Sequence, residues 1–290
     1  MLIKKTIATL LTVFCLCLLG YADLALAEDR FKCYAPGVSG CTSALSESKD
    51  CRINYDYRIE VTEGAEDLVI LSIHGGLIEP YTSEVAATIA ASLDGKHYDF
   101  FAHATESCRG GCVETNSEPK LAIGNFSSLH ITSTKFNEEQ ALKLVGANSK
   151  AVSIHGYSPR RDYDMGQICV GGARYLNGGE EVDGERVPNE QVTKFVNYIN
   201  NNREDLPLNA TDAREAQEGE LCGKIQRSNG RTFQALGGKS LNNITNKNPQ
   251  KAGLQLEFNY DLLENLANMG DRQYDSYRQT IERAIEQAVM

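Results

Sequence analysis

The tetrapeptide Ser-Ile-His-Gly occurs twice in this 290-residue chain, each time at the end of an apolar run. The first copy contains His74, and Glu79 follows it five residues later; the second copy contains His155. Two imidazoles and one carboxylate are typical protein ligands of a catalytic zinc ion, whose fourth position stays open for water. His74, Glu79 and His155 therefore predict a site for one Zn²⁺ ion.

The two histidines must be held by neighbouring strands for this site to form. Residues 68–73 and 150–154 are short, apolar and rich in β-branched side chains, a pattern typical of strands buried on both faces of a parallel sheet. Ligands of open α/β sheets bind outside the carboxyl ends of strands, so parallel neighbours would present both imidazoles at one edge. A single histidine after a strand is more often a packed or capping residue. The repeated pattern with Glu79 in between favours a metal site.

Glu257 is the candidate general base. Residues 254–258 alternate, so that two leucines face one way and Glu257 the other. A carboxylate in a core strand is costly unless it is paired or faces a cavity, although on an edge strand it would simply face solvent. The functional interpretation is a base beside a zinc-bound water. His103 and His130 are weaker candidates, and His130, on a strand expected at residues 128–132, is interpreted as a buried residue that supports the site.

The remaining pattern alternates strands with helices. This predicts a single α/β domain whose mostly parallel or mixed central sheet is covered by helices. Further strands are expected at residues 58–61, 98–102 and 167–170, and helices at residues 82–93, 137–146, 188–199 and 273–290. Residues 203–250 show little periodicity. The sequence thus predicts one large domain, with few helices or strands at residues 203–250.

The amino terminus has the features of an export signal. Lys4 and Lys5 precede an apolar core and an Ala-Leu-Ala cleavage site, which predicts a signal peptide at residues 1–27. The apolar run is short for a membrane span, so cleavage is favoured over an uncleaved anchor, and no stable membrane insertion is expected afterwards. Residues 28–55 are interpreted as a cysteine-containing arm and residues 56–290 as the zinc-binding domain. The expected location is secreted, extracellular or periplasmic.

Cysteine content and net charge limit the alternatives. Seven cysteines follow the signal peptide: Cys33, Cys41, Cys51, Cys108, Cys112, Cys169 and Cys222. Export favours disulfides, and the odd number leaves at least one thiol unpaired or paired between chains. A zinc site made of cysteines is less favoured, because the sequence has no paired C-x-x-C motifs. No local sequence pattern supports a nucleophilic cysteine. The net charge of −10 argues against nucleic acid as a partner, and we expect a monomer.

Several of these motifs resemble those of one known family. They are His-Gly-Gly at 74–76 with Glu79, residues 129–133, 153–156, 170–172 and 253–257, and the asparagines at 243 and 246. In this order, from about residue 57 to 261, they resemble the poly-γ-glutamate hydrolase family of phages and bacteria. The resemblance implies a zinc carboxypeptidase-like fold, hydrolysis of γ-glutamyl amide bonds, zinc held by His74, Glu79 and His155, and Glu257 as the base.

Departures from the family pattern leave the exact substrate open. The family often has an arginine shortly after the Glu257 position, where this chain has Asp-Leu-Leu at 261–263, and the cysteine-rich segments look like additions. A γ-glutamyl polymer is a polyanion, so an acidic protein must hold it with local cations, for which arginine is well suited. The candidate substrate-binding residues are Arg160, Arg161, Arg174, Asn243 and Asn246. The alternatives are a secreted zinc peptidase or deacylase acting on other peptides or acyl amino acids, and a non-enzymatic binding module on the same fold.

Overall fold

The structure is a computed structural model. It describes residues 57–102, 130–157, 167–182, 184–202, 206–216, 222–223, 225–226, 232–233, 236–268 and 272–290. Outside these lie the expected signal peptide and cysteine-containing arm, Cys108, Cys112, His103, Arg160 and Arg161. The domain boundaries therefore stay a prediction. In the described part of the chain, no helix has both the length and the apolar character that crossing a membrane requires.

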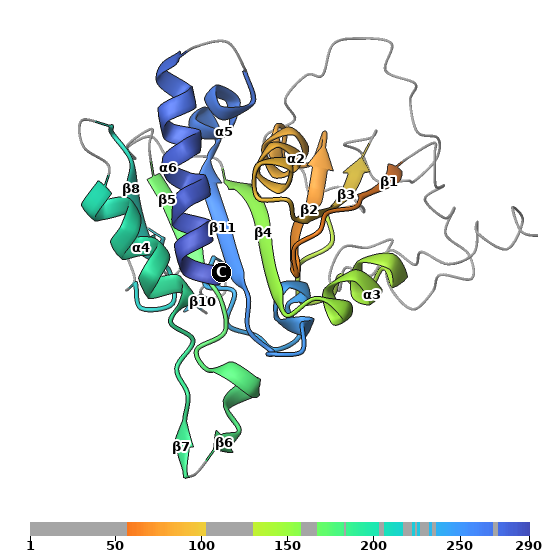
Figure 1. The fold of residues 1–290 in the computed structure, drawn as a ribbon, viewed down its shortest axis with the longest axis vertical. Helices are drawn as coiled ribbons and strands as arrows, with labels where there is room; N and C mark the ends of the chain where they lie inside the picture. Colours follow the sequence, from red (N-terminus) through yellow and green to blue (C-terminus); the bar gives the residue numbers. More distant parts are fainter. Residues whose placement is uncertain are drawn as a thin grey trace, which may run out of the picture.

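A seven-stranded mixed sheet forms the centre of the domain, with strand order β1-β3-β2-β4-β11-β5-β8 (Figure 1). Its strands are β1 (Tyr57–Thr62), β2 (Leu68–Gly76), β3 (Lys96–Ala102), β4 (Lys150–Tyr157), β5 (Gln167–Gly171), β8 (Asn209–Asp212) and β11 (Leu254–Asn259). The four central strands β3, β2, β4 and β11 run parallel, whereas β1 and β5 run antiparallel to the neighbours β3 and β11. The expected mixed α/β fold is therefore confirmed.

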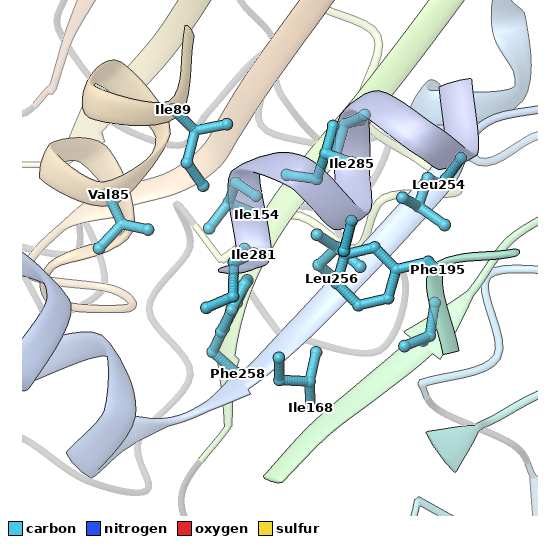
Figure 2. Close-up of a cluster of buried hydrophobic side chains, with 14 of the residues drawn as sticks. Val85, Ile89, Ile154, Ile168, Phe195, Leu254, Leu256, Phe258, Ile281 and Ile285 are labelled. Carbon is cyan, nitrogen blue, oxygen red and sulfur yellow. The ribbon is translucent and has the colours of Figure 1, made fainter. Parts of the chain in front are cut away.

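Helices cover both faces of this sheet. The face that carries Leu68, Ile154 and Leu256 packs against helices α2, α4, α5 and α6 in the largest apolar cluster (Figure 2). A second cluster lies around Ile73 and Ile131 and includes helix α3 and the short 3₁₀ helix η2. The helix bounds are α2 (Thr82–Ser92), α3 (Glu139–Ala147), α4 (Gln191–Asn202), α5 (Tyr260–Ala267), α6 (Arg272–Val289), η1 (Leu176–Gly179) and η2 (Ile244–Lys247). Two short hairpins, β6 (Glu181–Val182) with β7 (Glu185–Arg186) and β9 (Ile225–Gln226) with β10 (Thr232–Phe233), stand outside the main sheet.

Strand β11 carries core residues on one face and the candidate base on the other. Leu254, Leu256 and Phe258 are fully buried in the larger cluster (Figure 2). Because successive side chains of a strand point to opposite faces, Gln255 and Glu257 lie on the other face of the sheet. The predicted opposition of the leucines and Glu257 is therefore confirmed.

One local prediction was wrong, and one strand was not predicted. The strand expected at residues 128–132 is not a strand where it is described: residues 130–132 pair with no neighbouring strand, and the Thr132 carbonyl accepts the backbone N–H groups of Lys135 and Phe136, which makes a turn. His130 is therefore not on a central strand. Strand β8 went unpredicted because it is short and polar and becomes a strand only by pairing with β5.

Candidate metal centre

His74 lies within an irregularity of strand β2. Ser72 pairs with Asp99 of β3 and Gly75 pairs with Phe101, so β2 has one residue more than β3 between these pairs. Such a bulge interrupts the alternation of side chains and can turn a side chain toward the other face. Ile73 packs into the cluster that contains Ile131, and the next residue, His74, also reaches Ile131 through its carbonyl oxygen. The bulge thus places two consecutive side chains of β2 on one side.

His155 and Glu257 lie side by side on parallel strands. They are register partners between β4 and β11, and β4 also pairs in parallel with β2. His74, His155 and Glu257 are all buried, with 4%, 2% and 6% of their surface exposed. Parallel pairing therefore brings the two histidines to the same edge of the sheet, as the repeated tetrapeptide predicted.

Glu79 completes the cluster from the turn between β2 and α2. Its backbone N–H donates to the His74 carbonyl (2.8 Å), which folds the chain back toward the strand end. Its carboxylate atom Oε1 lies 2.7 Å from His74 Nδ1, and Oε2 lies 3.3 Å from His155 Nδ1. The Gly156 N–H donates to Oε2 (3.0 Å) and fixes the carboxylate between the two rings.

The tautomer of His74 leaves a lone pair on Nδ1, which faces Glu79 and His155. His74 Nε2 lies 2.8 Å from the Ile131 carbonyl, which can only accept, so the ring proton is on Nε2 and Nδ1 carries a lone pair. His155 is oriented in the same sense, with Nε2 3.5 Å from Ser133 Oγ and Nδ1 3.1 Å from His74 Nδ1. Metal-binding histidines characteristically use the second ring nitrogen in this way. Two nitrogens and a carboxylate converge here as a cation would require.

The electrostatics of the cluster lead to the same conclusion. Burial lowers the pKa of His74 to about 4, which keeps this imidazole neutral, as a ligand must be. Burial also works against a charged His155, but the carboxylates of Glu257 and Glu79 outweigh it and raise the pKa of His155 to about 9. A proton on His155 can therefore balance the negative charges when no cation is present. These residues fit a divalent metal ion.

His130 joins this cluster from the chain segment before the Thr132 turn. Its Nε2 lies 3.5 Å from Glu79 Oε1, and its ring lies edge-on to the His74 ring at 4.4 Å between centroids. Ligand atoms of His74, Glu79 and His130 all lie within 4.8 Å of one another. His130 can therefore serve as an additional ligand. Sequence reasoning underrated it, because no spacing links a residue in a non-strand segment to the two repeated histidines.

Glu257 has the properties of a base. Burial raises the pKa of its carboxyl to about 7, against the opposing effect of His155. Its Oε1 accepts a hydrogen bond from Gln255 Nε2 at 2.7 Å. A carboxylate with a pKa near neutral is well matched to taking up and returning a proton at physiological pH.

The structure does not bring Arg174 to this cluster. Strand β5 runs antiparallel to β11, so it begins beside Phe258 and ends beside Gln255. Arg174 follows the end of β5 and therefore lies toward the edge of the sheet opposite His155. There it is half exposed and pairs with Glu215, with 3.2 Å between Nη2 and Oε1.

The two candidate asparagines are buried in the fold. Asn246 accepts from the backbone N–H of Gly253 and donates to the carbonyls of Gly238 and Ser240, so its amide holds loops together. Asn243 caps helix η2 by accepting from the Thr245 N–H. Neither amide is placed to contact a substrate directly.

A disulfide joins Cys169 and Cys222, which are separated by 53 residues. The sequence left the pairing open. Cys169 is the register partner of Glu257 across β5 and β11, and directly opposed residues of a strand pair share a face. The disulfide therefore lies next to the candidate base, and neither sulfur is available as a nucleophile while it is bonded.

The sheet, its helices and the position of the cluster define an α/β protein with a zinc carboxypeptidase-like fold. A family model described as poly-gamma-glutamate hydrolase matches residues 43–109 and 119–179. The chain therefore resembles this family in sequence as well as in fold, which confirms the expectation from its motifs and supports a hydrolase.

Two curated proteins of Bacillus subtilis (strain 168) are similar in sequence. The chain is 34% identical to the UPF0714 protein YndL over 128 residues, which cover 44% of this chain and 41% of YndL. It is 26% identical to the SPbeta prophage-derived UPF0714 protein YoqZ over 226 residues, which cover 78% of this chain and 61% of YoqZ. The matches thus span about half the length of these relatives.

Two solved structures share the fold. A bacteriophage poly-gamma-glutamate hydrolase has a TM-score of 0.54 and 21% identity, over 83% of this chain and 92% of the other. The YndL structure described as apo and zinc-free has a TM-score of 0.55 and 21% identity, over 86% of this chain and 97% of the other. At this level of identity, the two structures show the fold alone.

Proposed function

We propose that this protein is a zinc-dependent hydrolase that cleaves the γ-glutamyl amide bonds of poly-γ-glutamate. One observation carries the proposal: the Nδ1 atoms of His74 and His155 and the carboxylate of Glu79 converge with 2.7–3.3 Å between them. Such a group of nitrogen and oxygen ligands is suited to a divalent cation, and a proton on His155 takes over its balancing positive charge when no cation is bound. The family match and the two solved relatives, a poly-gamma-glutamate hydrolase and the zinc-free form of YndL, support the substrate class and zinc.

The chain's own residues supply orientation and proton transfer. Zinc bound by His74, Glu79 and His155 would supply a water of lowered pKa and polarise the amide carbonyl. Glu257, which lies beside His155 on the next strand, accepts the proton of the attacking water. It then returns this proton to the leaving nitrogen, so the carboxylate is regenerated in each turnover. The Ile131 carbonyl holds the His74 ring in the tautomer that this arrangement needs.

The cations that hold the polymer are proposed to be Arg160 and Arg161. Both lie outside the described residues, between Tyr157 at the end of β4 and Gln167 at the start of β5. These two flanking residues lie at the edge of the sheet that carries His155. Replacing the arginine that clamps the carboxylate by alanine should raise KM roughly tenfold to a hundredfold. Arg174→Ala is the matched control and should leave KM unchanged, since Arg174 lies toward the opposite edge.

Export is part of the proposal. The amino-terminal signal pattern supports it, and the Cys169–Cys222 disulfide is of the kind that persists in oxidising compartments. Amino-terminal sequencing of protein recovered from the culture medium or periplasm should find cleavage after Ala27. Retention of the uncleaved chain in the cytoplasm would contradict export without bearing on the chemistry.

The decisive experiment combines metal analysis with a polymer assay. The purified protein should contain about one zinc per chain and shorten poly-γ-glutamate on a gel; chelation should stop this and zinc should restore it. Cleavage of an α-linked polyglutamate would indicate a general peptidase instead. Glu257→Gln should keep zinc and lower kcat by roughly a hundredfold or more, whereas Glu190→Gln, an exposed glutamate, should not. A fully active Glu257→Gln variant, or activity that survives complete removal of metal, would refute the mechanism.

A further inference from the structure

A chain of buried amides leads to the candidate base from the face of the sheet opposite the main helix layer. Asn243 Nδ2 donates to Gln255 Oε1 at 2.6 Å, and Gln255 Nε2 donates to Glu257 Oε1 at 2.7 Å. Asn243 and Gln255 have only 2% and 3% of their surface exposed. Buried amides are costly unless they are hydrogen-bonded, so this arrangement must be satisfied as a unit.

The direction of these hydrogen bonds is set at Asn243, the amide farthest from Glu257. The Thr245 backbone N–H can only donate, and it donates to Asn243 Oδ1 at 3.0 Å. The other end of the Asn243 amide is therefore its NH₂ group, which faces Gln255 and requires the Gln255 carbonyl oxygen there. The NH₂ group of Gln255 must then face Glu257. One backbone N–H thus orients both amides.

This orientation distinguishes the two oxygens of the Glu257 carboxylate. Oε1 receives a donated hydrogen bond and acts as an acceptor, so a proton taken up by the carboxylate belongs on Oε2. The bond also holds the side chain in one direction, and a base must be held within hydrogen-bond reach of the proton that it abstracts. Gln255 lies two residues before Glu257 on the same face of β11, so the strand itself supplies the spacing.

We propose that Gln255 is a positioning residue for Glu257, and that Asn243, oriented by the Thr245 N–H, sets the direction in which Gln255 acts. The inference rests on the proposed role of Glu257 as the base. It also gives Asn243 a role different from substrate binding: it reaches the reaction only through Gln255.

Steady-state kinetics on poly-γ-glutamate test the positioning role. Gln255→Met keeps the length of the side chain and removes both hydrogen bonds; kcat should fall roughly tenfold to a hundredfold while KM and zinc content stay at the wild-type values. Asn243→Asp keeps the oxygen that caps η2 but cannot donate to Gln255, and it should lower kcat similarly. Asn248→Asp is the matched control, because among the described residues this buried amide donates only to the backbone carbonyls of Ser149 and Ala252. It should leave kcat unchanged.

A double-mutant comparison separates positioning from general stabilisation. If Gln255 acts through Glu257, adding Gln255→Met to Glu257→Gln should lower kcat no further. Independent, multiplying losses in the double variant, or a wild-type kcat in Gln255→Met, would overturn the proposal.

A second readout does not depend on hydrolysis. In ¹⁵N spectra of the zinc-loaded protein, the side-chain amide of Gln255 should be protected from exchange in wild type and Asn248→Asp, and lose that protection in Asn243→Asp. An unprotected Gln255 amide in wild type refutes the relay of hydrogen bonds whether or not the polymer is cleaved. A protected amide in a wild-type protein that cleaves no polymer would instead refute the proposed function.

Discussion

Replacing Asp99 by asparagine should make the stability of the protein rise with pH between about 4 and 6.5. Asp99 and His97 are neighbours on β3, both almost fully buried, and they meet at the Ser72 hydroxyl. Ser72 Oγ donates to Asp99 Oδ1 at 2.8 Å and lies 3.1 Å from His97 Nε2. Burial raises the pKa of Asp99 from 3.8 to about 6 and lowers the pKa of His97 from 6.5 to about 4.

These two shifts have opposite effects on the free energy of unfolding. Between pH 4 and 6 the folded pair holds one proton on Asp99, and the unfolded pair holds one proton on His97. The number of bound protons is then equal in both states, so the pair adds almost no pH dependence in wild type. Without Asp99, the folded state holds no proton and the unfolded state holds one on His97. Stability should then rise by about 3 kcal/mol up to pH 6.5, at 1.36 kcal/mol per pKa unit.

His97→Gln should produce the opposite slope. The folded state then binds a proton on Asp99 that the unfolded state has released, so stability should fall by about 3 kcal/mol as the pH rises from about 4 to 6. Urea unfolding followed by circular dichroism at half-unit steps from pH 4 to 7 measures both variants against wild type. Asp94→Asn, at an exposed position, is the control and should run parallel to wild type. Difference curves for Asp99→Asn and His97→Gln that are both independent of pH would refute this reasoning.

Two further changes test the frame around the site. Replacing Cys169 and Cys222 by serine should lower the free energy of unfolding by about 4 kcal/mol, the chain-entropy value for a 53-residue loop; an equal denaturant midpoint for the variant and oxidised wild type would contradict this. Gly75→Ala should destabilise the protein by roughly 1–3 kcal/mol, because a Cβ would fall 2.5 Å from Asp99 Oδ1. Gly146→Ala is its control, because no atom lies within 4 Å of a Cβ added at this position. The added methyl group in α3 should stabilise the protein by about 0.5–1 kcal/mol, measured by thermal unfolding.

The sequence predicts those parts of the site that depend on strand ends. His74 and His155 follow apolar runs, and parallel pairing of such runs brings their ends together whatever the details of packing. Glu257 was predictable from alternation within β11. His130 was not, because it reaches Glu79 from a segment without regular pairing. Gln255 was not either, because its proposed role depends on a hydrogen bond to Asn243, the residue that caps η2.

Strand direction was the least predictable property, and it changes which side chains surround Glu257, the candidate base. An apolar run such as 167–170 carries no mark of its direction, and β5 runs antiparallel to β11. This reversal takes Arg174 away from the site and sets Cys169 beside Glu257. Cys169 and Cys222 form a small apolar cluster with Ala213 and Ala216, so the carboxylate borders on apolar side chains.

An apolar border has a consequence for the pKa of the base. Burial disfavours a charged carboxylate and, together with the negative charge of Glu79, raises the pKa of Glu257 to about 7 against the opposing effect of His155. Had β5 run parallel to β11, Arg174 would have followed the strand at the site edge, and its positive charge would have lowered that pKa. The antiparallel strand thus keeps the Arg174 guanidinium away from Glu257, which favours the raised pKa of this carboxyl.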